Sequence, residues 1–201
     1  MSRLISHLAS VFLALSLLIA PAHAAGEGEA KAVVESITDE IVNALKTTEG
    51  NRDARQSAFE QIFDNRADVG AIGRFVAGRY WRGASKADQQ EYLDAYKDFI
   101  AFSYAAKMSG YSGETIAVGR VIDAGKKGLI VKSSIKRGNG APPVSVDWRL
   151  KKRGSTLKVI DMIVERVSLA VTQRSEFQSH LRKSGGDLAK LTEVLRQRMG
   201  G

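Results

Sequence analysis

The chain contains no cysteine and only three histidines. Two of these, His7 and His23, lie in the first 24 residues, so His180 is the single imidazole in the rest of the chain. Zinc sites, cysteine nucleophiles and multi-histidine centres need several such side chains. A serine–histidine–aspartate triad would have to use His180, and no nucleophile-elbow motif accompanies it. We therefore expect no metal, no cofactor and no catalytic residue.

Long apolar runs are also scarce, and the one present lies at the N-terminus. Arg3 precedes a stretch from Leu8 to Ala20 whose only polar residues are two serines, and Ala22-His23-Ala24 has the form of a signal-peptidase site. The stretch is too short to span a bilayer comfortably, since that needs about 20 apolar residues. We expect residues 1–24 to be a cleaved signal peptide, with Ala25 as the first residue of an exported chain.

An exported domain without disulfides depends on its hydrophobic core alone. The remaining 177 of the 201 residues suffice for one domain, because a chain of about 150 residues buries about two-thirds of its unfolded surface. Their net charge is +7, one less than that of the full chain, since Arg3 is the only charged residue of the leader. This excess favours an anionic partner. Export, and the lack of an aromatic-and-basic motif, argue against nucleic acid.

Hydrophobic periodicity divides the chain into a helical first half, a run of strands and a helical end. Apolar residues at helical spacing predict six helices, at 30–46, 52–63, 69–77, 85–108, 173–183 and 187–199. Runs rich in β-branched residues, separated by short turns, predict four antiparallel strands, at 115–123, 128–136, 144–152 and 156–167. We therefore predict a single α+β domain over residues 25–201, in which a helical layer packs on a twisted four-stranded antiparallel sheet.

The most specific pattern lies near the end of the chain. It places Asp161 and Val164-Glu165 in the last strand, followed by Ser168 and by Thr172-Gln173-Arg174-Ser175-Glu176-Phe177. This pattern resembles the MlaC, or toluene-tolerance, family of periplasmic phospholipid-shuttling proteins. The resemblance covers roughly residues 30–199, because two further segments before an aromatic-rich helix also fit: Gly73-Arg74-Phe75 and Tyr80-Trp81.

The resemblance implies that the helical layer and the sheet enclose an apolar pocket for acyl chains, whereas the residues alone favour a filled core. The side chains expected to line the pocket are Tyr96, Phe99, Ile100, Val144, Val146, Trp148, Ile160, Met162, Val164 and Phe177. A charged head group should stay at the mouth, because burying a charge is costly. The basic residues expected to contact the head group or to gate the pocket are Arg74, Arg79 and Arg174, with Arg82, Arg120 and Lys132 as further candidates.

By the same resemblance, the chain would be a monomeric periplasmic carrier of phospholipid. Its partners would be an outer-membrane lipoprotein complex and an inner-membrane MCE-type ABC transporter, and its role would be to maintain outer-membrane lipid asymmetry. Some members of the family belong to hopanoid pathways, so a hopanoid is the alternative ligand. An envelope adaptor with a filled core is a further alternative that composition alone leaves open.

Asp161 leaves a different functional class open. A lone carboxylate in an apolar strand can serve as a general base, so a small isomerase-like enzyme is the alternative to a carrier. The same side chain could instead point to solvent, or pair with Arg149 or Lys151 on the neighbouring strand. A pairing of this kind would give Asp161 a structural role.

The segment 172–176 also has two interpretations. It lies where the last predicted strand passes into a helix, and Phe177 begins the apolar face of that helix. A polar hinge beside an apolar anchor would suit a gate that a docking partner shifts. Alternatively, the segment begins the helix locally, with Thr172 or Ser175 capping free amides.

Overall fold

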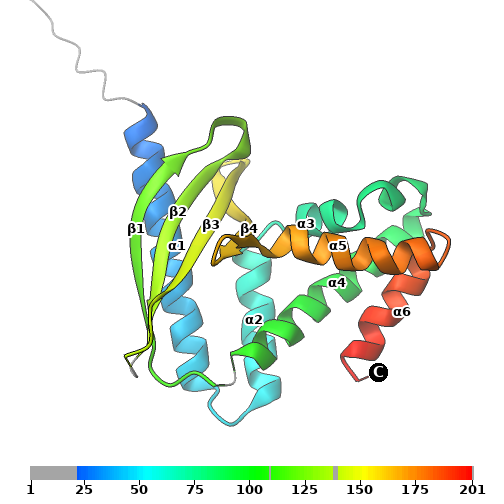
Figure 1. Cartoon of the computed structure of the whole chain (residues 1–201), viewed down its shortest axis with the longest axis horizontal. Coiled ribbons are helices and arrows are strands. Elements are labelled where there is room, and N and C mark those ends of the chain that lie inside the picture. The colour runs from blue at the N-terminus through cyan, green and yellow to red at the C-terminus, as the bar shows by residue number, and fades with distance from the viewer. Residues whose placement is uncertain (1–21, 109, 138–139, 201) are drawn as a thin grey trace, which may run out of the picture.

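Figure 1 shows the fold as a computed structural model, which describes residues 22–108, 110–137 and 140–200. In this part of the chain the helices are α1 (Ala22–Thr47), α2 (Arg52–Arg66), α3 (Val69–Ala77), α4 (Lys86–Lys107), α5 (Leu169–Lys183) and α6 (Leu188–Arg198), with short 3-10 helices η1 (Gly78–Gly83) and η2 (Gly125–Lys127). The strands are β1 (Thr115–Asp123), β2 (Leu129–Lys136), β3 (Val144–Arg153), β4 (Thr156–Val164) and β5 (Val167–Ser168). Most of the predicted signal peptide, residues 1–21, lies outside the described residues, and α1 begins at Ala22.

The sheet is an antiparallel meander in which spatial order follows chain order, from β1 to β5. The α+β class is confirmed, but the prediction of four strands is wrong, because the last β-branched run is two strands. Glu165 and Arg166 form the turn between them, with positive φ values of 48° and 69°. A two-residue hairpin turn of type I′ requires positive φ at both positions and usually contains Asn or Gly. Neither residue type marks this turn, so the pattern predicted one continuous strand to Val167.

The inner face of the sheet packs against α1 and α2 and forms a first hydrophobic cluster. Residues of α1 at helical spacing meet alternate residues of the strands, because successive side chains of a strand point to opposite faces of the sheet. The principal members are Val34, Ile37, Ile41, Leu45, Phe59, Val131, Val146, Trp148 and Leu150. Trp148 satisfies its ring N–H by donating to Ser133 Oγ at 3.0 Å, so the indole is buried without an unpaired donor.

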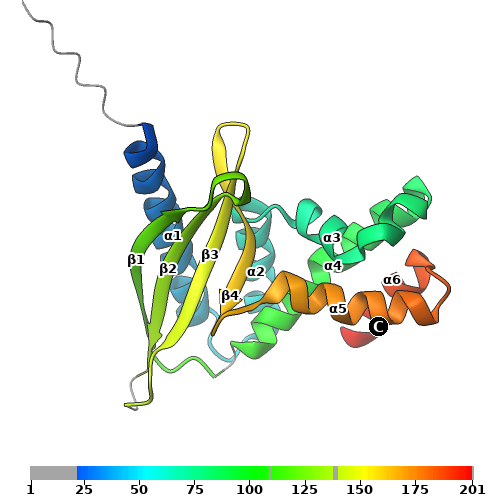
Figure 2. The same cartoon turned by 45° about the horizontal axis from the view of Figure 1, so that its top comes forward.

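The second hydrophobic cluster lies beside the sheet, among α3, α4, α5 and α6 (Figures 1 and 2). Tyr92 and Tyr96 stack at 5.8 Å, and Phe177 meets Tyr96 edge-on at 6.2 Å. Both hydroxyls donate hydrogen bonds, Tyr92 to the Gly73 carbonyl at 3.1 Å and Tyr96 to Gln173 Oε1 at 2.7 Å. Burial disfavours the phenolate form and raises the pKa of both tyrosines well above the usual range.

Helix α4 belongs to both clusters. Its 22 residues extend about 33 Å, and they bury Tyr96 in the second cluster and Ala101 and Ala105 in the first. Where the clusters meet, Phe63 of α2 contacts Tyr104 edge-on at 5.4 Å, and burial raises the pKa of Tyr104 to about 12. The predicted single helical layer is therefore divided: α1, α2 and the end of α4 cover the sheet, and the remaining helices pack on one another.

The junction between α2 and α3 is attached to the sheet. Ala67 forms a parallel bridge with Val159, and the Asp68 N–H donates to the Val159 carbonyl at 2.9 Å. The Asp68 carboxylate caps α3 by accepting from the Ala71 N–H at 2.9 Å, and it also pairs with Arg153 at the end of β3. These bonds fix where the chain leaves the first cluster and enters the second.

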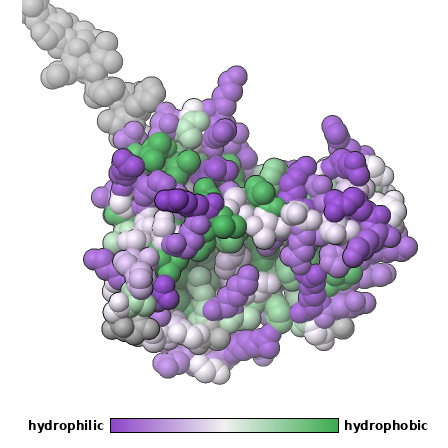
Figure 3. Space-filling model, in the orientation of Figure 1, coloured by the Kyte–Doolittle hydropathy of each residue, from purple (hydrophilic) through white to green (hydrophobic). Residues whose placement is uncertain are grey.

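The face shown in Figure 3 is largely hydrophilic over the helical cluster, and hydrophobic residues reach the surface over the sheet and beside the junction with α5. Among the residues that the structure describes, the exposed large apolar side chains are Phe75, Val167 and Val171. In the described part of the chain, every helix is too short or too polar to cross a membrane.

Candidate functional site

Three cavities lie in a row between the sheet and the helices packed on it, chiefly α1, α2 and α4, and we call this row the seam. Its central cavity has a volume of 40 Å³ and is lined by Ile41, Phe63, Tyr104, Met108, Trp148 and Met162, among others. A 50 Å³ cavity shares Phe63, Tyr104 and Met162 with it on one side. A 260 Å³ cavity shares Ile41 and Met108 with it on the other side. The seam is thus a nearly continuous line of apolar surface between sheet and helices.

The residues predicted to line a pocket are divided between the two hydrophobic clusters. Trp148 and Met162 line the central cavity, and Tyr96, Ile100 and Met162 line the 50 Å³ cavity. The other sheet residues of the prediction, Val144, Val146 and Val164, pack within the first cluster. Phe99 and Phe177 face each other in the second cluster with centroids 5.8 Å apart. Ile160 is half-buried at the register shift between β3 and β4.

Asp161 is buried, with 6% of its surface exposed, and its carboxylate accepts three hydrogen bonds. Arg149 Nη1 and Ser168 Oγ donate to Oδ2 at 3.3 Å and 2.7 Å, and the Ala170 N–H donates to Oδ1 at 3.1 Å. Arg149 lies directly opposite on β3, so the predicted pairing between these two residues is confirmed. The carboxylate anchors the start of α5 to the sheet, which is a structural arrangement rather than that of a free base.

Comparison with known proteins identifies the family to which the chain belongs. Residues 31–197 match a family model described as MlaC protein. The chain belongs to the MlaC family. Over 164 residues it is 24% identical to the toluene tolerance protein ttg2D of Pseudomonas putida, a match that covers 79% of this chain and 75% of that protein.

Two further relatives connect the family to lipids by their names. One is the intermembrane phospholipid transport system binding protein MlaC of Haemophilus influenzae, 25% identical over 118 residues, and the match spans 57% of this chain and 55% of that protein's length. The other is a solved structure of a phospholipid-binding protein from Ralstonia solanacearum in complex with a phospholipid. It has a TM-score of 0.70 and 26% identity, and the match covers 85% of this chain and 97% of that one.

In this MlaC-family protein, much of the seam comes from residues that the sequence did not single out. They lie on α1, α2 and the last turns of α4: Ile37, Ile41, Phe59, Ile62, Phe63, Tyr104 and Met108. Helical spacing marked these faces as buried. Periodicity shows that a helix face is covered, but not which element covers it. That information lies in the tertiary arrangement.

The family motif at 172–176 lies inside α5, not at its start. The helix begins at Leu169, and Ser168 is its N-cap, accepting from the Val171 N–H at 3.1 Å. The predicted strand-to-helix transition at this segment and the predicted caps, Thr172 or Ser175, are therefore wrong in position. The β-branched residues Val171 and Thr172 continue the strand-like pattern into the first helical turn, which concealed the boundary.

The three principal basic residues predicted for the head group or gate lie on the helical cluster, whereas the further candidates Arg120 and Lys132 lie on β1 and β2. Arg174 donates to the Phe75 carbonyl and lies over its ring at 4.7 Å, joining α5 to α3. Arg79 donates to the Tyr80 hydroxyl at 2.8 Å, and Arg74 is exposed on α3. Glu176 of the motif pairs with Arg198 at 2.6 Å and joins α5 to α6. These contacts make the motif a set of links between helices, while a gating role stays a prediction.

Proposed function

We propose that this protein is a periplasmic carrier that holds a phospholipid by its acyl chains in the seam and shuttles it between outer-membrane and inner-membrane transport complexes. The observation that carries the proposal is the seam itself, an apolar line between sheet and helices. The fold that contains it matches, at a TM-score of 0.70, a structure solved with a phospholipid. The predicted signal peptide supports the periplasmic location, and the name of the Haemophilus relative supports an intermembrane route.

The energetics of acyl chains explain why a carrier needs such a seam. Each buried methylene is worth about 0.8 kcal/mol, so two chains with ~30 methylenes represent more than ~20 kcal/mol of gross transfer free energy. A carrier cannot expose that surface to water during transit. Walls as apolar as the bilayer core make the exchange nearly balanced, so direction must come from the partner complexes.

The seam must widen to accept a chain, because its central cavity of 40 Å³ is far smaller than the roughly 300–1,000 Å³ of ligand pockets. The contacts of α1 are compatible with such a movement. Arg66 of α2 donates from Nε to Glu40 of α1 at 3.1 Å, so these two helices are joined to each other. The contacts of α1 with the sheet are chiefly apolar, whereas the end of α2 is also bonded to β4, where Lys158 donates to the Asn65 carbonyl. Acyl chains would replace those apolar contacts with others of the same kind.

The direct test is chemical extraction of the purified protein. Protein prepared without detergent should release phospholipid into organic solvent, identified by mass spectrometry, and the same spectrum would reveal a hopanoid. Extracts that are repeatedly free of lipid would contradict a carrier function.

A substitution in the seam tests where the chains lie. Met108 lines both the central and the 260 Å³ cavities, so Met108→Trp should fill acyl-chain volume and lower lipid content at little cost in stability. The matched control is Val131→Phe, at a fully buried position of the same cluster outside those cavities, where overpacking should cost about 1–3 kcal/mol. If Met108→Trp is as destabilising as the control and retains its lipid, the chains do not occupy the seam.

A further inference from the structure

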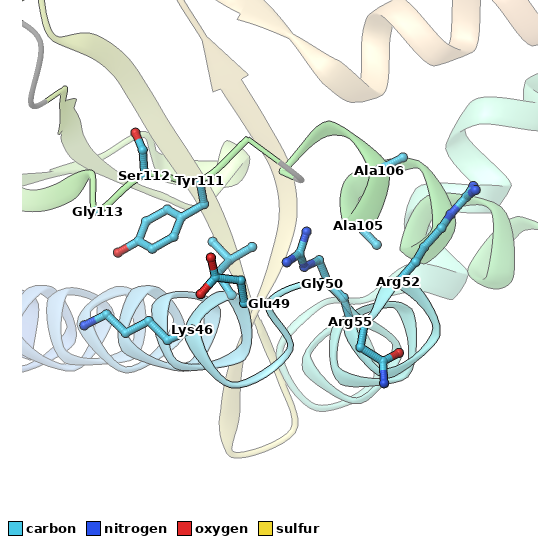
Figure 4. Close-up of a pocket in the computed structure, with 12 residues that line it drawn as sticks. Lys46, Glu49, Gly50, Arg52, Arg55, Ala105, Ala106, Tyr111, Ser112 and Gly113 are labelled. Atoms are coloured by element: carbon cyan, nitrogen blue, oxygen red, sulfur yellow. The ribbon is translucent and has the colours of Figure 1, made fainter.

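The largest of the cavities described is a cleft of 690 Å³ at the turn between α1 and α2 (Figure 4). Its walls are the end of α1, the first turn of α2, the end of α4 and the segment 111–113. Leu45 and Tyr111 line both this cleft and the 260 Å³ cavity of the seam. A mostly apolar cavity therefore adjoins a cleft whose lining combines apolar and charged side chains.

Arg55 is the distinctive side chain of the cleft. It is 8% exposed, and its guanidinium donates to Thr48, from Nε to Oγ1 and from Nη2 to the carbonyl oxygen, both at 3.3 Å. Among the described residues, no carboxylate forms an ion pair with it. Figure 4 shows the guanidinium pointing into the cleft, between Glu49 and Ala105. A guanidinium has five N–H donors, and a buried charge is normally paired, so Arg55 has capacity for an anion.

The surroundings of Arg55 add positive charge. Lys46 and Arg52 also line the cleft, against Glu49 as the one acidic lining residue. The Arg52 guanidinium lies 4.5 Å from the centroid of the Phe102 ring, a cation–π contact that leaves its donors available. The first turn of α2 contributes the positive end of a helix dipole at the same place.

We propose that this cleft binds the phosphate group of an amphiphile whose acyl chains lie in the seam, with Arg55 as the principal ligand and Arg52 and Lys46 as supporting charges. The placement of the acyl chains rests on the proposed function. A free phosphate ester has the same phosphate chemistry as the lipid head group, so the cleft could bind either ligand. Guanidinium suits this ligand because two of its N–H groups can bond two phosphate oxygens side by side. The head group then remains in an open cleft while the chains are buried. This position is at the α1–α2 turn and not at the arginines of the helical cluster.

The test compares three probes with the full protein: vesicles of phosphatidylglycerol, phosphate-free vesicles of a digalactosyl diacylglycerol with the same chains, and free glycerol phosphate. Arg55→Gln should weaken phosphatidylglycerol binding about tenfold or more, as expected for losing a charge-assisted bond, and leave digalactosyl diacylglycerol binding unchanged. Arg55→Lys, which keeps the charge without the paired donors, should give an intermediate loss. Lys183→Gln is the control: it removes an exposed charge at the end of α5 and should change neither phosphatidylglycerol binding nor digalactosyl diacylglycerol binding.

Arg55 also holds Thr48, so the thermal midpoint of each variant is measured in parallel. The double variant Lys46→Gln with Arg52→Gln alters exposed side chains only and should show the same selective loss to a smaller degree. Equal losses for phosphatidylglycerol and digalactosyl diacylglycerol, or no loss for either, would overturn the phosphate site while leaving the carrier intact. If glycerol phosphate binds in an Arg55-dependent way and no lipid binds, the proposed anion site is supported and the proposed carrier function is contradicted.

Discussion

Asp161 connects three strands and a helix through one carboxylate. The side chain is on β4, and its donors are on β3, on β5 and in the first turn of α5. Arg149, its partner on β3, has a buried Nε that makes no hydrogen bond among the described residues. Loss of the carboxylate would therefore leave a second, partly buried charge uncompensated.

Asp161→Asn should lower the free energy of unfolding by about 2 kcal/mol, because the neutral amide accepts weaker bonds and leaves Arg149 unpaired. Urea unfolding measures this change. The control is Asp64→Asn, which breaks an exposed pair with Lys97 and should cost about 0.5 kcal/mol or less. Equal costs for the two variants would contradict the anchoring role, and a catalytic base at Asp161 would instead show lost turnover with stability unchanged.

At the scale of elements, the start of α5 distinguishes the structure from the sequence pattern. Ser168→Ala should destabilise the protein by about 1–2 kcal/mol, since it removes the N-cap and a donor to Asp161. Thr172→Ala and Ser175→Ala should each cost about 0.5 kcal/mol or less, because both residues are exposed on a helix already begun. Chemical denaturation of the three variants measures these costs and shows which residue caps α5. A cost at Thr172 that matches the cost at Ser168 would show that the helix starts later.

The elements that the sequence predicted correctly share a strong local signal. Helices with an apolar face every three or four residues, and the runs rich in β-branched residues, were located, although α1 begins at Ala22, eight residues before the predicted start. The short β5 was missed because its turn, Glu165-Arg166, lacks the residues that usually mark positive φ.

The candidate site was only partly predictable for a different reason. Trp148 and Met162, two residues of the predicted pocket, line the seam because they share one face of the sheet. Ile41 and Met108 come from helices whose packing partners no local pattern specifies. Arg55 resembles any helical arginine in the sequence. Its burial, and its lack of an acidic partner among the residues that the structure describes, appear only when the α1–α2 turn meets the end of α4.

At the scale of the whole molecule, two ion pairs connect parts that are distant in the chain. Arg66 hydrogen-bonds Glu40 and lowers the pKa of that carboxyl below its ordinary 4.5. Burial alone would raise the pKa of Asp68, but bonds from Arg153 and the Ala71 N–H outweigh it and hold this pKa below 3.8. A lowered pKa means that the charged form favours the folded state, so the stabilisation is present above the ordinary value and is lost as the pH falls through the lowered one.

The thermal midpoint should therefore fall once the pH drops below about 4.5. The double variant Glu40→Gln with Asp68→Asn should have a lower thermal midpoint than the wild type near neutral pH. The difference between the two midpoints should disappear in acid. Asparagine at position 68 preserves the cap of α3. Asp98 acts in the opposite sense, because burial raises its pKa and protonation in acid favours the fold. Calorimetry measures both thermal midpoints across this pH range. A difference between wild type and variant that stays constant into acid would show that the two ion pairs do not cause it.

The order of the strands also has a kinetic consequence. Every strand pairs with its neighbour in the chain, so the sheet can grow hairpin by hairpin with short loop closures. The contacts of α1 with β1 and β2 span a much longer stretch of chain, and such closures are slower to form. During the interval between these steps the inner face of the sheet, Trp148 included, lies bare to solvent. A nascent molecule is then most prone to aggregate with others of its kind, and a chaperone holding it would protect that face first.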